Sequence, residues 1–142
     1  MNKKIAIGAD HAGYDLKCEL IIYLEHKGFS VVEFGCSSPA SIDYPDYAHK
    51  VAKKVKLDKK NLGILVCGSG TGMNIAANKH KNIRAAQCFN LKSTKLSRLH
   101  NDANIITLGS RLITKKNALK FISVFLNTKF DGGRHLKRLK KI

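Results

Sequence analysis

The sequence predicts an α/β protein, a three-layer α/β/α Rossmann-like sandwich around a five-stranded parallel sheet. Five short apolar runs rich in Ile and Val alternate with amphipathic helical segments from one end of the chain to the other. Such runs are typical of strands that helices cover on both faces. Repeated strand–helix units place the strands in parallel, with right-handed crossovers. No break in composition and no repeat divides the 142 residues, so one domain spanning 1–142 is expected.

The apolar runs and the spacing of apolar residues locate the first elements. The expected strands are residues 4–9, 30–34, 62–67, 84–88 and 104–108. Leu16, Leu20 and Leu24 recur at helical spacing before Gly28, which is a suitable helix stop. A second helix is expected to open at Pro45, because proline is well tolerated in the first turn of a helix.

The remaining helices follow from caps and periodicity. A short third helix is expected at 74–79 and a fourth at 91–99. Thr114 is a suitable N-terminal cap for a fifth helix with a strongly apolar face. After two glycines, a basic helix or tail is expected from about 133, with its helical part at 134–141.

The net charge of +16 raises the possibility of a nucleic-acid-binding module. However, 21 of the 26 basic residues are lysines dispersed over the expected helix faces. No zinc-finger spacing and no RNA-binding aromatic signature accompany them. A solvated lysine-rich surface is therefore the preferred interpretation, and nucleic acid is not an expected partner.

Several segments bear on cellular location and redox state. No apolar run approaches the ~20 residues of a membrane span. The first residues lead directly into a strand and are too short for a signal peptide, so a cytoplasmic protein is expected. Cys18, Cys36, Cys67 and Cys88 have neither paired nor metal-ligand spacing, so they are expected to be reduced thiols without zinc.

The third expected strand ends at Cys67 and leads into three alternating glycines at 68–72. Backbone N–H groups of such a loop can gather an anion, and a helix that starts there favours a thiolate over a thiol. This combination suits a catalytic base beside an oxyanion site. The alternative is a tight turn with a buried cysteine. The loop lacks the lysine of a Walker A motif, and Met73 stands where a dinucleotide fingerprint needs glycine.

Polar residues follow the ends of several expected strands. Asp10 and His11 follow the first strand, Cys67 ends the third, Asn90 follows the fourth and Arg111 follows the fifth. In parallel sheets, ligands bind beyond the carboxyl ends of the strands, where the strand order switches. If the first and third strands are neighbours, Asp10, His11 and Cys67 converge in one cleft. A capping aspartate and a surface histidine are the alternative.

Two further groups have more than one interpretation. His100, followed by Asn101, closes the fourth helix, where a histidine suits either the helix dipole or proton transfer to a sugar oxygen. Arg134 and Arg138 are four residues apart, so both guanidinium groups leave one helix face and can clamp a phosphate. A solvated basic tail is the alternative for the arginines.

Six motifs then occur in order: IGADHAG (7–13), DYP (43–45), CGSGTG (67–72), SRLHNDAN (97–104), LGSR (108–111) and GGRH (132–135). Together they resemble the type B ribose-5-phosphate isomerases, within the wider group of type B sugar-phosphate isomerases. The resemblance covers essentially the whole chain. It implies interconversion of D-ribose 5-phosphate and D-ribulose 5-phosphate through a cis-enediolate, without cofactor or metal, in the non-oxidative pentose phosphate pathway.

The resemblance also implies roles for individual residues. Cys67 would take the C2 proton and return it at C1, His100 would open the sugar ring, and Asp10 would assist ring opening or move hydroxyl protons. The oxyanion would be held by Asn101 and by the loop residues Gly68, Ser69, Gly70, Thr71 and Gly72, among which Ser69 adds a hydroxyl. The phosphate would be bound by His11, Arg111, Arg134 and Arg138, and Tyr44 would line the sugar site.

Departures from the family pattern are few. Some members use a glutamate just after the third loop glycine in place of the cysteine, but Met73 stands there and cannot accept a proton. The family works as dimers or tetramers with sites built across subunit interfaces, so a homodimer or homotetramer is expected. A hexose-phosphate isomerase of the same group, acting on allose or galactose 6-phosphate, is the alternative function.

Overall fold

The computed structural model describes residues 3–35 and 40–142. Cys36 lies outside these residues. Within them, one parallel sheet has the strand order β2-β1-β3-β5-β4. The strands are β1 (Lys4–Ala9), β2 (Ser30–Gly35), β3 (Leu62–Cys67), β4 (Ala85–Gln87) and β5 (Ile105–Gly109). The predicted α/β fold with five parallel strands is confirmed.

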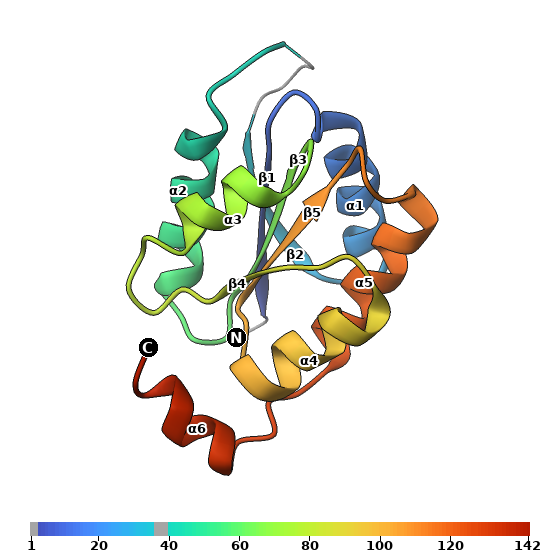
Figure 1. The fold of residues 1–142 in the computed structure, drawn as a ribbon. Coiled ribbons are helices and arrows are strands. Elements are labelled where there is room, and N and C mark those ends of the chain that lie inside the picture. Colours follow the sequence, from blue (N-terminus) through green and yellow to red (C-terminus); the bar gives the residue numbers. More distant parts are fainter. Residues whose placement is uncertain (1–2, 36–39) are drawn as a thin grey trace.

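Helices pack on both faces of this sheet (Figure 1). They are α1 (Tyr14–His26), α2 (Tyr44–Lys56), α3 (Thr71–Ala77), α4 (Leu91–Asn101), α5 (Lys115–Asn127) and α6 (Arg134–Leu139). One core cluster joins the sheet to α1 and α5, and a second joins it to α2 and α3. α4 lies beside α5, and α6 projects beyond the sheet at the end where the chain begins (Figure 1). None of the helices in the described part of the chain could span a membrane.

The predicted strands agree with the observed ones to within one residue at each end. The predicted Thr114 cap is confirmed, since its side chain accepts a hydrogen bond from the Asn117 N–H at 3.2 Å. The prediction of the third helix at 74–79 is wrong: the helix starts at Thr71 and ends at Ala77. Gly70 has a φ of +81°, and this left-handed residue turns the chain into the helix directly after the loop.

β1 and β3 are hydrogen-bonded neighbours, as the convergence hypothesis required. From this pair, β2 lies on one side and β5 on the other, so the order of the sheet switches here. The loop after β1 lies tightly against β3, since a Cβ on Gly13 would lie 2.4 Å from the carbonyl oxygen of Val66. The switch point is therefore a closely packed corner at the carboxyl edge of the sheet.

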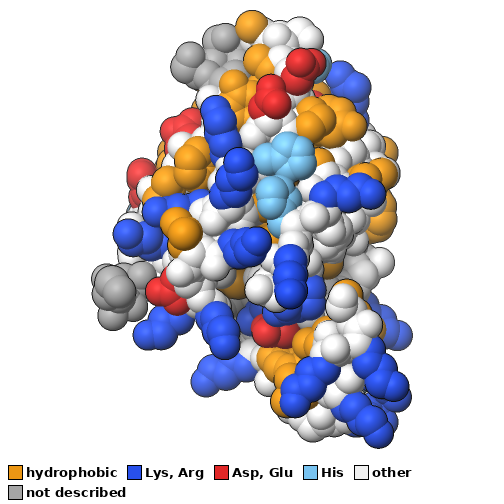
Figure 2. Space-filling view, turned by 90° about the vertical axis from the view of Figure 1, so that its left-hand side faces the viewer, with side chains coloured by type: hydrophobic (Ala, Val, Ile, Leu, Met, Phe, Trp, Pro, Cys, Tyr) orange, Lys and Arg blue, Asp and Glu red, His pale blue; other side chains and the backbone are white. Residues whose placement is uncertain are grey.

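Figure 2 shows the face formed by α2 and α3, with Lys and Arg side chains spread across it around histidine side chains. His49 on α2 and His80, just after α3, approach each other on this side of the sheet. Their Nδ1 and Nε2 atoms lie 2.7 Å apart, and Lys53 and Lys56 contribute positive charge nearby. Burial lowers the pKa of His80 below its usual 6.5, and the charges of His49, Lys56 and Lys53 lower it further.

This lowered pKa predicts a loss of stability in acid. The unfolded chain binds a proton at His80 more readily than the folded chain does. The contribution of neutral His80 to the free energy of unfolding is therefore complete above about pH 6.5 and is lost as the pH falls through the folded pKa. We expect the denaturant midpoint to fall between pH 7 and pH 5, and to fall less in His80→Gln. The matched control is His26→Gln, at an exposed histidine of α1. Equal pH dependence in wild type and His80→Gln would contradict the assignment.

Candidate active site

The loop after β3 encloses the sulfur of Cys67. The side chain is only 5% exposed, and its Sγ accepts a hydrogen bond from the Gly70 N–H at 3.1 Å. The N–H groups of Ser69 and Gly72 have no hydrogen-bond partner within residues 3–35 and 40–142. The loop therefore places the Cys67 sulfur beside backbone donors that have no partner in the described part of the chain.

Asp10 and His11 lie at the adjacent corner, after β1. Asp10 is buried, its N–H donates to the carbonyl oxygen of Val66, and its Oδ1 accepts from the Gly13 N–H at 2.9 Å. Asp10 is therefore a turn-forming residue as well as a neighbour of the cysteine loop. The Nδ1 of His11 is buried without a hydrogen-bond partner in the described part of the chain. A buried polar atom of this kind is suited to a ligand.

Arg111 and Tyr44 close on the loop from two sides. The Arg111 guanidinium lies over Gly68, where an added Cβ would be 3.1 Å from its Nη1. The Tyr44 ring lies over Gly72, where an added Cβ would be 2.4 Å from ring carbon. At each of these two positions, a residue larger than glycine would push the neighbouring Arg111 or Tyr44 side chain away from the loop.

Gln87, at the end of β4, was missed by sequence reasoning. Its Nε2 donates to the Ser69 carbonyl oxygen at 2.8 Å and to the Thr71 hydroxyl at 3.0 Å. The Ser69 hydroxyl itself accepts from the Thr71 N–H at 3.2 Å. These bonds fix the backbone of the loop between β3 and α3. Asn90, another residue at this edge, caps α4 by accepting from the Ser93 N–H at 2.8 Å.

The other predicted residues lie at the opposite edge of the sheet. His100 and Asn101 end α4, which runs back from β4 toward the amino ends of the strands, and Arg134 and Arg138 are on α6. The six residues of β3 separate the two edges by about 20 Å. A single chain therefore brings together Asp10, His11, Tyr44, Arg111 and the loop 67–72, but not His100, Asn101, Arg134 or Arg138.

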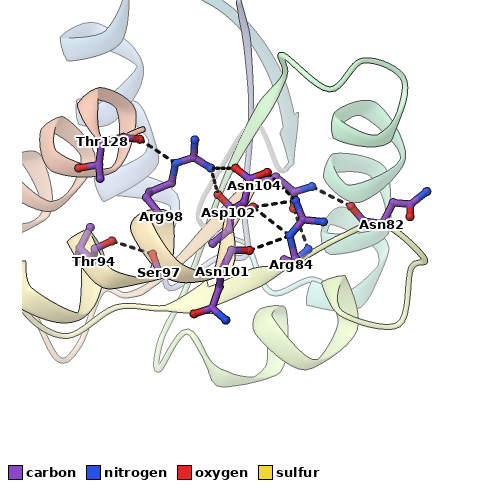
Figure 3. Close-up of polar contacts among 10 residues, drawn as sticks. Asn82, Arg84, Thr94, Ser97, Arg98, Asn101, Asp102, Asn104 and Thr128 are labelled. Carbon is purple, nitrogen blue, oxygen red and sulfur yellow. Dashed lines mark hydrogen bonds and ion pairs between the residues drawn. The ribbon is translucent and has the colours of Figure 1, made fainter. Parts of the chain in front are cut away.

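A polar network holds the end of α4 in place (Figure 3). Asp102 accepts from Arg84 Nη2 at 3.1 Å and from Arg98 Nη1 at 2.9 Å. Arg84 Nε also donates to the Asn101 carbonyl oxygen at 2.9 Å, and Arg98 Nε donates to the Thr128 carbonyl oxygen at 3.2 Å. Two of the five arginines are thus structural. The other three, at 111, 134 and 138, form no ion pair with the described residues.

His135 is a second residue that sequence reasoning did not place near the site. It is buried, and its ring stacks on that of His100 with centroids 4.3 Å apart and an interplanar angle of 14°. Burial lowers its pKa, and His100, Arg134 and Arg138 lower it further, against an opposing effect of Asp131. His135 therefore binds a proton less readily than a free histidine, and it packs against one face of the His100 ring.

Comparison with known proteins assigns this arrangement to a family. The family described as Ribose/Galactose Isomerase matches residues 5–142. This chain belongs to the ribose/galactose isomerase family. The ribose-5-phosphate isomerase B of Escherichia coli is 42% identical over 140 residues, which are 99% of this chain and 94% of that protein.

Two solved structures show the same likeness within this isomerase family. Ribose-5-phosphate isomerase B of Clostridium thermocellum has a TM-score of 0.95 and 46% identity, covering 97% of this chain and 93% of the other. The Mycoplasma genitalium enzyme with bound ribulose-5-phosphate has a TM-score of 0.96 and 43% identity, covering 99% and 94%. As a ribose/galactose isomerase, the chain shares the whole fold of these enzymes.

Proposed function

We propose that the protein interconverts D-ribose 5-phosphate and D-ribulose 5-phosphate in the cytoplasm, as a step of the non-oxidative pentose phosphate pathway. The observation that carries this proposal is the Cys67 sulfur held beside free N–H groups of the loop 68–72. The bound ribulose-5-phosphate of the similar Mycoplasma genitalium enzyme supports the choice of substrate. The same comparisons favour an isomerase over a basic nucleic-acid-binding module.

In the proposed reaction, the Cys67 thiolate removes the C2 proton of the open-chain aldose and the electron pair forms a cis-enediolate. The resulting thiol then returns the proton to C1, and the O2 hydroxyl proton passes to O1, so both proton transfers balance without a cofactor. Negative charge develops on oxygen in the intermediate, and the N–H groups of Ser69 and Gly72 are available to donate hydrogen bonds to that oxygen. One such preorganised donor typically contributes about 3–4 kcal/mol to lowering the barrier.

The same proposal assigns ring opening to His100, with Asp10 assisting the movement of hydroxyl protons. Asn101 would add a side-chain donor to the oxyanion, and Tyr44 would line the sugar. The phosphate would lie among His11, Arg111, Arg134 and Arg138. Guanidinium groups suit this task because each offers a planar fork of donors to phosphate oxygens.

The separation of the two groups of residues supports a homo-oligomeric site. His100 and the α6 arginines cannot reach Cys67 of their own chain across about 20 Å of sheet. We therefore propose a homodimer or homotetramer in which a second copy supplies these side chains. Ile75, Phe89 and Leu91 are each about half exposed, and such apolar side chains suit an interface between copies.

The discriminating experiment is a direct assay of the purified protein with ribose 5-phosphate and with allose 6-phosphate. We expect kcat/KM to be far higher for ribose 5-phosphate. A preference for the hexose phosphate would favour the alternative member of the family. Turnover of neither sugar phosphate would overturn the proposed function.

The phosphate clamp predicts a selective defect in substrate binding. Replacing Arg134 and Arg138 by glutamine is expected to raise KM for ribose 5-phosphate by at least about 10²-fold, since each of the two charge-assisted contacts contributes roughly 1.5–3 kcal/mol. Free ribose, which has no phosphate, should be converted as slowly by the variant as by the wild type. The matched control is Lys137→Gln together with Lys141→Gln on the same segment. Equal effects on both sugars would contradict the clamp.

A further inference from the structure

We infer that His100, Asp131 and His135 form an inhibitory binding site for a transition-metal dication, with Zn²⁺ as the best-suited ion. The inhibitory effect rests on the proposed role of His100 in ring opening, whereas metal binding does not depend on that role. One ligand atom of each of the three side chains lies within 4.8 Å of the other two. Two imidazoles and one carboxylate are a ligand set that zinc commonly takes, with a fourth position open.

The three ligands are fixed on one framework. The Asp131 N–H donates to the Leu99 carbonyl oxygen at 3.0 Å, which ties the turn before α6 to the end of α4 beside His100. Arg98 ties α4 to Thr128 in the same region. His135 is the second residue of α6, four residues after Asp131 in the loop that leads into this helix. The cluster is therefore assembled by tertiary contacts between segments 30 residues apart, without the close Cys or His spacing that marks zinc sites in a sequence.

The state of His135 points to a ligand. Its side chain is more than nine-tenths buried and stacks on His100, and its ring nitrogens are not among the buried unpartnered atoms of the described residues, so they remain open to a ligand. Tetrahedral zinc holds its ligand atoms about 3.3 Å apart, at zinc–nitrogen distances of about 2.0–2.1 Å. Because the two rings stack nearly parallel, the half-buried His100 ring must turn out of the stack for its lone pair to meet that of His135 at one ion, with the exposed Asp131 carboxylate as the third ligand.

Charge makes Asp131 the decisive ligand. Arg134 and Arg138 lie on the same short helix as His135, and their charge opposes a cation. The Asp131 carboxylate is the only anionic member of the cluster. A metal bound here would take the His100 nitrogen that ring opening requires, so binding and turnover would compete.

Calorimetric titration with zinc chloride, in the absence of sugar, tests the site. We expect one zinc per chain in the wild type and in Cys67→Ser, and at least about tenfold weaker binding in Asp131→Asn. Asp131 is exposed, so the asparagine variant is expected to fold. Cobalt should give the visible bands of a tetrahedral site without a thiolate charge-transfer band. Loss of binding in Cys67→Ser, or unchanged affinity in Asp131→Asn, would overturn the inference.

Turnover assays with and without zinc separate this inference from the proposed function. Zinc should inhibit wild-type turnover, a chelator should restore it, and Asp131→Asn should keep its basal turnover while resisting inhibition. Equal inhibition of the wild type and Asp131→Asn would overturn the inhibitory role. A protein that binds zinc as expected but converts no sugar phosphate would overturn the proposed function and leave the metal site standing.

Discussion

Replacing Cys67 by serine is expected to lower kcat for ribose 5-phosphate about 10³-fold, the usual contribution of a positioned base. A serine hydroxyl is a far weaker base than a thiolate, and Met73, the neighbour that ends the loop, is fully buried and has no proton-accepting group. The fold should persist, because serine is close to cysteine in size. An assay of turnover measures the fall in kcat, and calorimetric titration with the substrate shows whether the folded variant still binds it.

Cys18→Ser is the matched control for this substitution, because Cys18 lies on α1, outside the loop. Its turnover should equal that of the wild type. Cys88 is not a competing base, since burial raises the pKa of its thiol, against smaller opposing effects of Thr94 and Ser97. Near-normal turnover in Cys67→Ser would rule out this sulfur as the base.

Mixing two inactive variants is expected to restore activity if the site is shared between copies. The first variant carries Cys67→Ser, and the second carries His100→Asn with Arg134→Gln and Arg138→Gln. In a random mixture half of the dimers are mixed, and each mixed dimer has one intact site, so about one quarter of wild-type activity should return. Turnover is measured after co-expression, or after unfolding and refolding the two variants together.

The control for this experiment places all four substitutions in one chain and mixes it with Cys67→Ser. That mixture contains no intact site under either arrangement and should stay inactive. Recovery of activity only in the first mixture would distinguish a shared site from simple reactivation. Failure of both mixtures, with mixed dimers demonstrated by differently tagged chains, would contradict a site completed by a second copy.

The strands and the cysteine loop could be predicted from local patterns. Ile and Val runs identified β1 and β3 to the residue, and the polar residues after them were assigned to one edge once a parallel sheet was inferred. The start of α3 was missed because glycine is a poor helix former, whereas here Gly70 turns the chain and Gly72 lies in the first turn. The hydrogen bonds from Gln87 to the cysteine loop were missed because its partners are 16 and 18 residues away in the sequence.

By itself, the sequence determined the fold class, the family and the chemical identity of the groups in the candidate site. These depend on residue types and on spacings within one strand, helix or loop, which are local properties of the chain. Only the tertiary structure decided that Cys67 and the pair Arg134 and Arg138 lie at opposite edges of the sheet, and that His135 stacks on His100. Those outcomes depend on the strand order and on the packing of α6 against α4, which bring together or separate residues regardless of their distance along the chain.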